Sequence, residues 1–200
     1  MPEGRLVTQT ALFRRAEIAD YPAILRLQSA NYIHKLAADE RQQGFLSAEF
    51  SPEQVAALAQ DLGTTLAVVA DEVAGFLCAF RREFNHGSPV IAKMLECYDQ
   101  VEFEGRPLSV LKSYIYGPVC VAREYRGRGL LRGLYEAQRR DLAGQFDMGV
   151  AFVSRDNPHS LRAHTSGIAM KEVGDFELGD NTYVILVFQL PPDVKGQGSG

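Results

Sequence analysis

The chain has 200 residues, of which 46% are hydrophobic, with 21 basic and 25 acidic side chains and a formal net charge of −4. This length suits one domain with its own core, and the acidic balance argues against nucleic-acid binding, which needs a basic surface. No run approaches the roughly 18 apolar residues of a membrane-spanning helix, and the N-terminus lacks a signal-peptide layout. We expect a soluble cytoplasmic protein with no membrane partner: one domain over residues 1–190 and a flexible polar tail over residues 191–200.

The first part of the chain predicts one strand and two helices. Residues 12–16 are the strand candidate, and Asp20 is expected to be the N-cap of the helix that follows. Ser51 and Gln54 have the spacing of a capping box, which predicts a second helix closed by Gly63. Residues 36–50 show no pattern that decides between helix, strand and loop.

A hairpin is predicted next, from arms rich in β-forming residues over 66–70 and 73–84 with a turn at Asp71-Glu72. Residues 84–108 then leave this pattern and form an inserted segment, with a helix over 90–98 and a loop over 102–107. The cysteines have neither an even count nor the spacing of metal ligands, so we expect core thiols and no metal site. They are Cys78, Cys97 and Cys120.

The stretch from Ser113 to Arg140 organises the rest of the chain. It begins as an apolar strand in which Tyr114 and Tyr116, two residues apart, share one face of the sheet. Gly117-Pro118 then interrupts the strand and predicts a bulge, because proline has no N–H to donate to a neighbouring strand. A helix is predicted from Leu130 to Leu142.

The turn before this helix, Arg126-Gly127-Arg128-Gly129, brings together backbone N–H groups, the positive end of a helix dipole and two guanidinium groups. Such a concavity favours a phosphate. Arginines at the start of a helix oppose its dipole, and they are better tolerated when an anion lies among them. A dinucleotide-binding Rossmann unit would place its first glycine directly after the strand, whereas residues 122–126 intervene here.

The stretch resembles the pyrophosphate loop of the GNAT superfamily of acyl-CoA N-acyltransferases. That loop has Arg or Gln, two residues, Gly, one residue, then Gly or Ala, after a Val-x-Val strand end and an acidic-aromatic turn. Leu131 departs from the pattern, because Gly or Ala is usual there. The matching residues are Val119, Val121, Glu124, Tyr125, Arg126 and Gly129.

The resemblance implies an α/β fold with a mixed, mostly antiparallel sheet of about six to seven strands, flanking helices, and two parallel strands splayed at the site of acetyl-CoA, the cosubstrate. The N–H groups of Val119 and Val121 would bind the pantetheine arm, and the Val119 N–H would polarise the thioester carbonyl. The implied cofactor-binding residues are Val119, Cys120, Val121, Arg126, Gly127, Arg128, Gly129, Leu130, Leu131, Arg132, Asn157, Ser160 and His164.

A second motif follows the strand predicted over residues 148–153. His164 stands where the family usually has the tyrosine that protonates the departing CoA thiolate, so it is our candidate general acid. A core or capping histidine that only touches the cofactor is the alternative. A closing hairpin over 172–178 and 183–190 completes the predicted sheet. The residues that fit the family's motif are Asn157, Pro158, Ser160 and Gly167.

The predicted reaction is direct attack of a primary amine, carried by a small molecule or a peptide, on acetyl-CoA. The family's two carboxylate positions fall at Ile115 and Phe152, which cannot act as bases. Segment 84–108 is expected either to wall the acceptor pocket or to be a surface excursion. Tyr116 is a further catalytic candidate. The candidate bases are Glu83, His86, Glu96 and Asp99, and the candidate pocket residues are Tyr98, Tyr114 and Tyr116.

Two other classes of function stay open. Leu131, His164 and the missing carboxylate would fit a CoA-binding sensor of the same fold that has lost transferase activity. A Rossmann oxidoreductase would bind NAD or NADP instead of CoA. The identity of the amine and the formation of a homodimer are not decided by the sequence.

Overall fold

The computed structural model describes residues 10–47, 49–84 and 87–192. Seven strands form one sheet in the order β1-β2-β3-β6-β7-β9-β8, in which only β6 and β7 are parallel neighbours. This mixed, mostly antiparallel sheet confirms the expected fold class. A Rossmann unit is built on a parallel sheet, so the oxidoreductase alternative is wrong. The strands of the large sheet are β1 (Leu12–Arg15), β2 (Gly63–Val69), β3 (Glu72–Arg81), β6 (Ser113–Val121), β7 (Met148–Ser154), β8 (Lys171–Leu178) and β9 (Asn181–Gln189).

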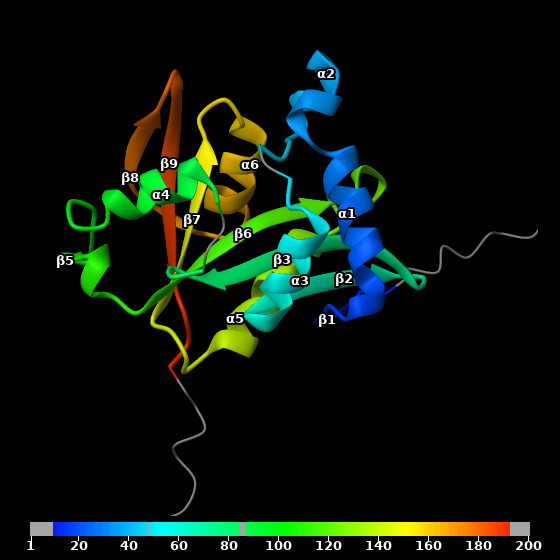
Figure 1. Cartoon of the computed structure of the whole chain (residues 1–200), viewed down its shortest axis with the longest axis horizontal. Helices are drawn as coiled ribbons and strands as arrows, with labels where there is room; N and C mark the ends of the chain where they lie inside the picture. Colours follow the sequence, from blue (N-terminus) through cyan, green and yellow to red (C-terminus); the bar gives the residue numbers. More distant parts are fainter. Residues whose placement is uncertain (1–9, 48, 85–86, 193–200) are drawn as a thin grey trace, which may run out of the picture.

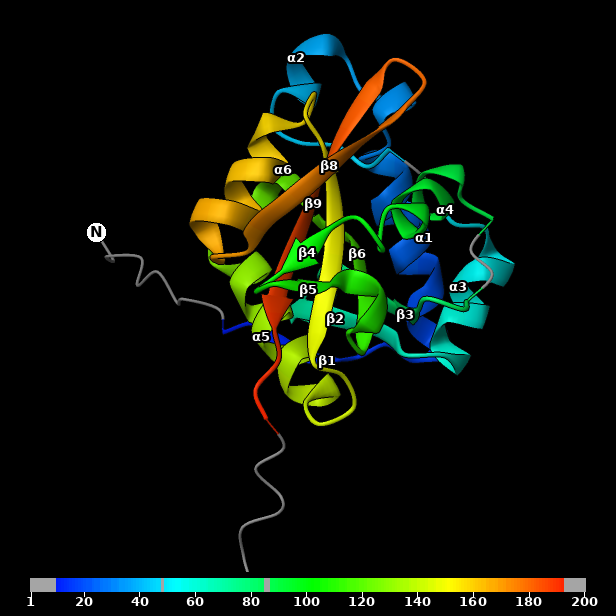
Figure 2. The same cartoon turned by 90° about the vertical axis from the view of Figure 1, so that its left-hand side faces the viewer.

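Helices cover both faces of this sheet (Figures 1 and 2). No helix in the described ranges is long and apolar enough to cross a membrane. Short 3₁₀ turns join several elements. The helices are α1 (Tyr21–Ala30), α2 (Ala38–Arg41), α3 (Pro52–Gln60), α4 (Pro89–Glu96), α5 (Leu130–Leu142) and α6 (Pro158–Arg162), the last running into a π-helical turn, η5 (Ala163–Gly167).

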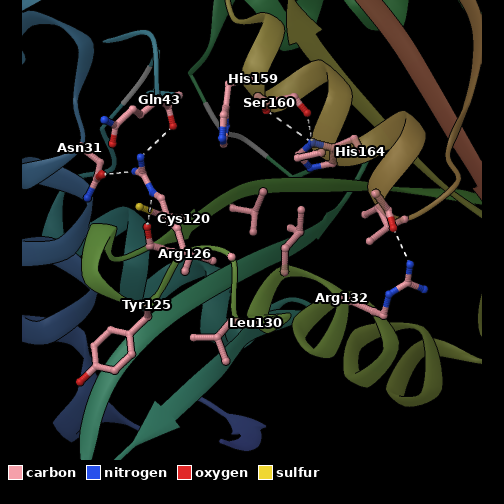
Figure 3. Close-up of a pocket in the computed structure, with 18 of the residues that line it drawn as sticks. Asn31, Gln43, Cys120, Tyr125, Arg126, Leu130, Arg132, His159, Ser160 and His164 are labelled. Carbon is pink, nitrogen blue, oxygen red and sulfur yellow. Dashed lines mark hydrogen bonds between the residues drawn. The ribbon is translucent and has the colours of Figure 1, made fainter. Parts of the chain in front are cut away.

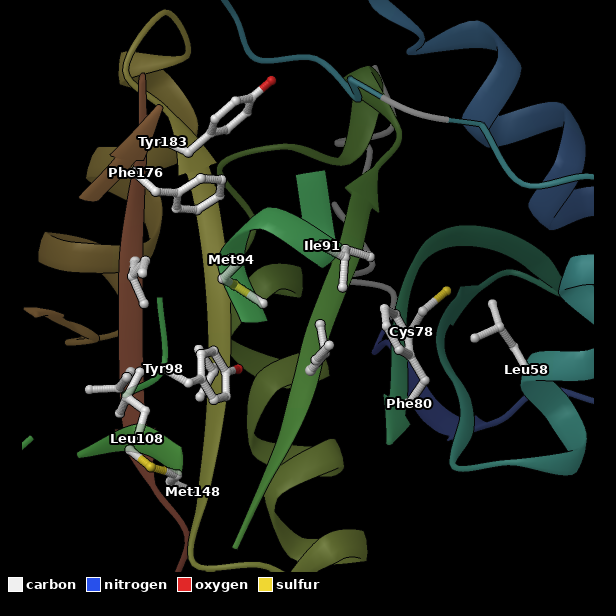
Figure 4. Packing of buried hydrophobic residues seen from close by; sticks show 14 of the residues in the cluster. Leu58, Cys78, Phe80, Ile91, Met94, Tyr98, Leu108, Met148, Phe176 and Tyr183 are labelled. Carbon is white, nitrogen blue, oxygen red and sulfur yellow. The ribbon is translucent and has the colours of Figure 1, made fainter. Parts of the chain in front are cut away.

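Two clusters of buried side chains hold these layers together. On one face of the sheet, α1, α3 and α4 contribute Ile24, Leu58 and Met94, and part of this cluster is drawn in Figure 4. On the other face, α5 contributes Leu134 and Tyr135. Burial of apolar area on both faces, worth about 25 cal/mol per Å², is the main stabilisation available to such a three-layer arrangement.

The N-terminal helices form as predicted, with one difference at Asp20. The Ser51 hydroxyl accepts the Gln54 N–H and the Gln54 side chain accepts the Ser51 N–H, so the capping box opens α3. Asp20 precedes α1 but makes no cap bond. Its backbone is already helical, and its carboxylate pairs with Arg14 at 2.7 Å, a charge-assisted bond that also lowers the pKa of Asp20.

The predicted hairpin is formed by β2 and β3, with Val69 opposite Glu72. Its turn is Ala70-Asp71, one residue earlier than predicted, and both residues have the positive φ that a tight two-residue hairpin turn needs (50° and 64°). In the inserted segment, the short strands β4 (Glu102–Phe103) and β5 (Arg106–Pro107) pair where the sequence predicted a loop.

The predicted interruption at Gly117-Pro118 is a β-bulge. The register on β3 advances by two residues, from Leu77 to Ala79, while the register on β6 moves by three, from Val119 to Tyr116. The extra residue on β6 reverses the alternation of its side chains. Side chains after the bulge therefore face the side opposite to the one that strict alternation would give them.

The two parallel strands separate near this bulge. Pairing between β6 and β7 runs from Ser113 opposite Met148 to Ile115 opposite Val150 and then ends. Beyond that point β6 remains paired with β3 only, so one edge of its second half is left without a neighbouring strand. This splay is the feature that the resemblance implied for the parallel pair.

Candidate active site

A cavity of about 330 Å³, the first cavity, lies where β6, the start of α5 and the α6–η5 segment meet (Figure 3). Residues 43–46 and Asn31 close it from the side of α1. Of the predicted cofactor-binding residues, Arg128 and Asn157 do not line it. Those that do are Val119, Cys120, Val121, Arg126, Gly127, Gly129, Leu130, Leu131, Arg132, Ser160 and His164.

The start of α5 presents backbone N–H groups that the protein does not use. The first N–H of this helix with a protein acceptor belongs to Gly133, which donates to Gly129 O at 3.0 Å. Within the described residues, the N–H groups from Gly127 to Arg132 have no protein partner. Gly127 and Gly129 have φ of 72° and 80°, a conformation that glycine adopts without strain and that turns the chain into the helix.

The second half of β6 adds two more donors. The Ala122 N–H donates to Ala74 O of the β3 side at 2.8 Å. Alternate residues of a strand direct their N–H groups to the same edge, so Cys120 also points toward β3. Val119 and Val121 must then direct their N–H groups to the opposite edge, where β7 has separated, and both residues line the first cavity.

The first cavity is cationic. Among the described residues that line it, the charged side chains are Arg126 and Arg132, and no Asp or Glu contributes. Burial lowers the pKa of the Arg126 guanidinium, the charge of Arg123 adds to the effect, and the oxygens that accept its hydrogen bonds are all neutral. Burial lowers the pKa of His159 as well, with the positive charges of Arg126 and Arg162 adding to the effect. An anion would relieve this uncompensated charge.

Arg126 serves a different role from the one expected of a free phosphate ligand. Its guanidinium donates to Gln43 O at 2.7 Å, Asn31 Oδ1 at 2.7 Å and Val121 O at 3.1 Å (Figure 3). These bonds occupy the side chain and tie the loop to the opposite wall of the cavity. Arg128 lies over the Tyr125 ring, 5.4 Å from its centroid.

His164 lies in η5, on the wall opposite β6 (Figure 3). Its side chain is buried, and its Nδ1 lies 2.7 Å from Ser160 O. A carbonyl can only accept, so Nδ1 carries the proton and the neutral ring has a lone pair on Nε2. Burial lowers the pKa of His164, which keeps it neutral at pH 7. A ring in this state accepts a proton before it can donate one, so the predicted general-acid role would require an earlier protonation of Nε2.

Neither a family model nor a curated protein matches this sequence, but solved structures match its fold. A Desulfovibrio desulfuricans protein described as an acetyltransferase of the GNAT family aligns with 91% of this chain and 100% of its own, at 14% identity and a TM-score of 0.59. Arabidopsis thaliana NAA60 in complex with a bisubstrate analogue aligns over 90% and 98%, at 14% identity and a TM-score of 0.63. The Salmonella typhimurium protein yncA, with its cofactor acetyl-CoA, aligns over 91% and 95%, at 17% identity and a TM-score of 0.59.

The chain has the GNAT fold. The sheet order, the splayed parallel pair and the glycine turn before α5 are the parts of this fold that the sequence resemblance implied.

A second cavity of about 120 Å³ lies where β6 and β7 of this GNAT fold separate, and residues 115–119 and 151–154 are part of its lining. It shares five residues with the first cavity, so the two meet there: Phe45, Leu46, Val119, Ser160 and His164. Among the described residues, no Asp, Glu, Lys or Arg lines it. Ile115 and Phe152, which hold the family's carboxylate positions, are both on its wall.

The three tyrosines predicted for the acceptor pocket are placed differently from one another. Tyr116 lines the second cavity, and its ring packs edge-on against His164 with centroids 5.6 Å apart. Its hydroxyl is buried with no hydrogen-bond partner among the described residues, and burial raises its pKa, so the ring rather than the hydroxyl reaches the site. Tyr114 and Tyr98 line neither cavity. Tyr114 is buried beneath α5, bonded to Gln138, and Tyr98 is buried in the opposite cluster, so the structure does not bring either of them to the described cavities.

The Asn157 side chain lies outside the lining of the first cavity and makes two bonds within the protein. Its Oδ1 accepts the Ser160 N–H at 3.2 Å and so caps α6, and its Nδ2 donates to Phe45 O at 3.0 Å. The amide therefore joins α6 to residues 43–46, and it keeps one N–H and one lone pair on the side of the second cavity. The sequence motif identified the cap position but not its tertiary partner.

The three candidate bases that the structure describes lie away from both cavities. Glu83, Glu96 and Asp99 are exposed and line neither cavity, and Glu96 pairs with Lys93 at 3.0 Å. His86 lies outside the described residues. The family's carboxylates have no replacement among the described lining residues, so His164 is the remaining titratable group that reaches both cavities.

Several lining residues were missed by the sequence. Asn31, residues 43–46 and His159 all line the first cavity. Residues 36–50 gave no pattern because their conformation is held by tertiary bonds, such as those from Arg126 and Asn157. His159 adjoins the Asn157-Pro158 motif, which is the signal by which it could have been found.

Proposed function

We propose that the protein transfers an acetyl group from acetyl-CoA to a primary amine, with CoA in the first cavity and the amine in the second. One observation carries this proposal: the N–H groups from Gly127 to Arg132 are unused, and every residue of this segment except Arg128 lines a cavity whose described lining has two arginines and no carboxylate. A diphosphate would satisfy these donors and the positive end of the α5 dipole together. The fold neighbours support the cosubstrate, since yncA is bound to acetyl-CoA and NAA60 to a bisubstrate analogue.

The N–H groups of Val119 and Val121 suit the pantetheine arm. Both face the unpaired edge of β6, as an additional strand would require. Acetyl-CoA supplies an activated acetyl thioester. The Val119 N–H, where the two cavities meet, is placed to stabilise the negative charge that develops on the carbonyl oxygen, with no reorganisation during the reaction.

His164 would move the proton between the two cavities. The amine nitrogen forms a bond to the acetyl carbon, and the bond from that carbon to sulfur breaks. The Nε2 lone pair of the neutral imidazole accepts the proton that the attacking nitrogen releases and returns it to the departing sulfur. The protein ends in its starting state, and the products are an amide and the free thiol.

Thermal unfolding and thiol release test this proposal together. Acetyl-CoA and CoA should raise the melting temperature, whereas NAD and NADP should not; a ligand at 100 times its Kd stabilises by about 2.7 kcal/mol. A panel of primary amines should then release CoA thiol from acetyl-CoA. Stabilisation without thiol release from any amine would indicate the CoA-binding sensor, and the absence of stabilisation would refute the site.

A further inference from the structure

The second cavity has no described side chain that could neutralise a cationic acceptor. Its described lining is mostly aliphatic and aromatic, with Ile91, Ile115 and Phe152 as examples. The titratable side chains on it are His164, which is neutral, and Tyr116, which stays protonated. Moving an ammonium group from water into such a space, with no carboxylate beside it, is strongly unfavourable.

The size of this cavity limits its occupant. Its volume is about 120 Å³. For comparison, an engineered cavity of about 150 Å³ lined by Leu, Ile and Phe in another protein binds benzene. One aromatic ring or a short branched alkyl group is therefore the scale of side group that the cavity can hold.

Among the described polar side chains of the second cavity, Ser160 and His164 adjoin the first cavity, and the others are uncharged at neutral pH and line the second cavity alone: Ser47, Ser88, Tyr116, Ser154 and Asn157. Ser160, His164 and the backbone of Val119 are shared with the first cavity, whereas Ile91 and Phe152 lie on the second cavity alone. An occupant with one polar nitrogen and one apolar arm would place its nitrogen at the junction and its arm among the apolar side chains. Phe152 also packs against Phe176 and Tyr183, with centroids 6.2 and 5.7 Å away, which holds this wall in place.

We propose that the second cavity is an acceptor site for a primary amine carried on a single apolar arm about the size of a benzene ring, and that it discriminates against polyamines and lysine-like amines. This inference rests on the proposed function. The cavity binds the amine without its proton, because burial in apolar surroundings disfavours the charged form. Such an arm belongs either to a free arylalkylamine or alkylamine, or to a peptide whose first residue is apolar.

A panel of acceptors measures this preference in the wild-type protein. 2-Phenylethylamine and isoamylamine should give kcat/KM values at least about tenfold above those of spermidine and lysine amide, a ratio of the size that apolar pockets produce. Two short peptides that differ only in their first residue, Phe or Lys, distinguish the sources of the arm. A higher kcat/KM for the Phe peptide than for 2-phenylethylamine assigns the arm to peptides, and the reverse assigns it to free amines. A preference for spermidine or lysine amide overturns the inference and leaves acetyl transfer intact.

A variant introduces the missing charge. Phe152→Glu places a carboxylate on the cavity wall at a half-buried position, and it should lower kcat/KM for 2-phenylethylamine about tenfold or more while raising it for spermidine. Leu178→Glu makes the same kind of change at a half-buried strand position that lines neither cavity. It should leave the ratio of kcat/KM for 2-phenylethylamine to kcat/KM for spermidine unchanged. Equal ratios in wild type and Phe152→Glu would overturn the inference.

A binding measurement separates this inference from the proposed function. Isothermal titration calorimetry of CoA-saturated protein with 2-phenylethylamine measures binding of the amine and requires no turnover. If no amine releases thiol, acetyl transfer fails, and binding of 2-phenylethylamine but not spermidine would still support the apolar site. Failure of 2-phenylethylamine to bind wild-type protein overturns the inference. If Phe152→Glu does not fold, the wild-type acceptor panel and this titration still test whether the second cavity prefers apolar amines.

Discussion

The two cavities are built on the same strand but have opposite chemistry. The first contains unused N–H groups and two arginines, whereas the described lining of the second has no charged side chain. The difference arises within β6, where the bulge reverses the side-chain faces and the loss of pairing with β7 frees backbone donors. In the function proposed above, one strand binds a charged cosubstrate along its second half and an uncharged acceptor near its first half.

This contrast also assigns a different task to each cavity. In the proposed site, charge complementarity in the first cavity would supply affinity for an anionic cosubstrate. In the second, the absence of charge favours the neutral amine, which is the nucleophilic form. Where the cavities meet, His164 is buried and neutral, so it can accept a proton without an added carboxylate.

The largest expected effect is the loss of cosubstrate binding in Gly129→Glu. A carboxylate about 4 Å from a diphosphate charge costs about 4 kcal/mol at an effective dielectric constant of about 20, or about a thousandfold in Kd. Isothermal titration with acetyl-CoA measures this. Gly129→Ala is the matched control. A Cβ at this position meets no atom within 4 Å, and the alanine variant has the same backbone strain at φ 80° as the glutamate variant but no added charge. Equal affinity in the two variants would refute the placement of the diphosphate.

Replacement of His164 should separate chemistry from binding. His164→Phe keeps an aromatic ring but removes the proton acceptor, so kcat should fall about a hundredfold while the Kd of acetyl-CoA changes little. Single-turnover kinetics and titration measure the two quantities. His164→Tyr restores a hydroxyl at the position where the family has one, and it should recover part of the turnover. An unchanged kcat in His164→Phe would remove this residue from the mechanism.

Arg126→Lys tests whether the first cavity depends on the hydrogen bonds that the Arg126 guanidinium makes across it or only on the positive charge of this side chain. Lysine keeps the charge but loses the fork that bonds Gln43 and Asn31, so acetyl-CoA affinity should fall about tenfold and stability by about 1.5 kcal/mol. Urea unfolding and titration measure both. Arg128→Lys, in the same loop but outside the cavity lining, should change either value by less than about 0.5 kcal/mol. Wild-type behaviour of Arg126→Lys would show that charge alone suffices.

The smallest expected effect is on the pH dependence of stability. The pKa of His164 is lower in the folded protein than the ordinary value near 6.5, so the unfolded chain binds the proton more tightly. The contribution of neutral His164 to the free energy of unfolding is complete above about pH 6.5, and it is lost as the pH falls through the pKa of His164 in the folded protein. His164→Phe should therefore lose less stability than wild type between pH 8 and pH 5 in urea titrations. His159→Gln is the companion variant, because its pKa is lowered too. Parallel curves for wild type and His164→Phe would show that the ring is not held neutral.

Local chemistry made much of the fold predictable. The bounds of α5, the capping box at Ser51 and the bulge at Gly117-Pro118 all follow from residues close together in the chain. Proline cannot donate a backbone N–H and glycine adopts positive φ without strain, so such features need no distant partner. The predicted strands and the closing hairpin follow in the same way from alternation and turn residues.

Side-chain roles were less predictable, because distant contacts decide them. The Arg126 guanidinium is occupied by groups 83 and 95 residues away, and the Asn157 amide by a carbonyl 112 residues away. Tyr114 and Tyr116 share a face as predicted, yet only Tyr116 lies far enough along β6 to reach a cavity.

By itself, the sequence determined the strand, glycine turn and helix that leave backbone donors free, since this arrangement depends on local backbone preferences. Only the tertiary structure decided which side chains those donors face, how the two cavities are joined at His164, and that the second cavity has no charge on its described lining. The reason is that a cavity is bounded by elements far apart in the chain, and the sequence pattern of any one element does not record what packs against it.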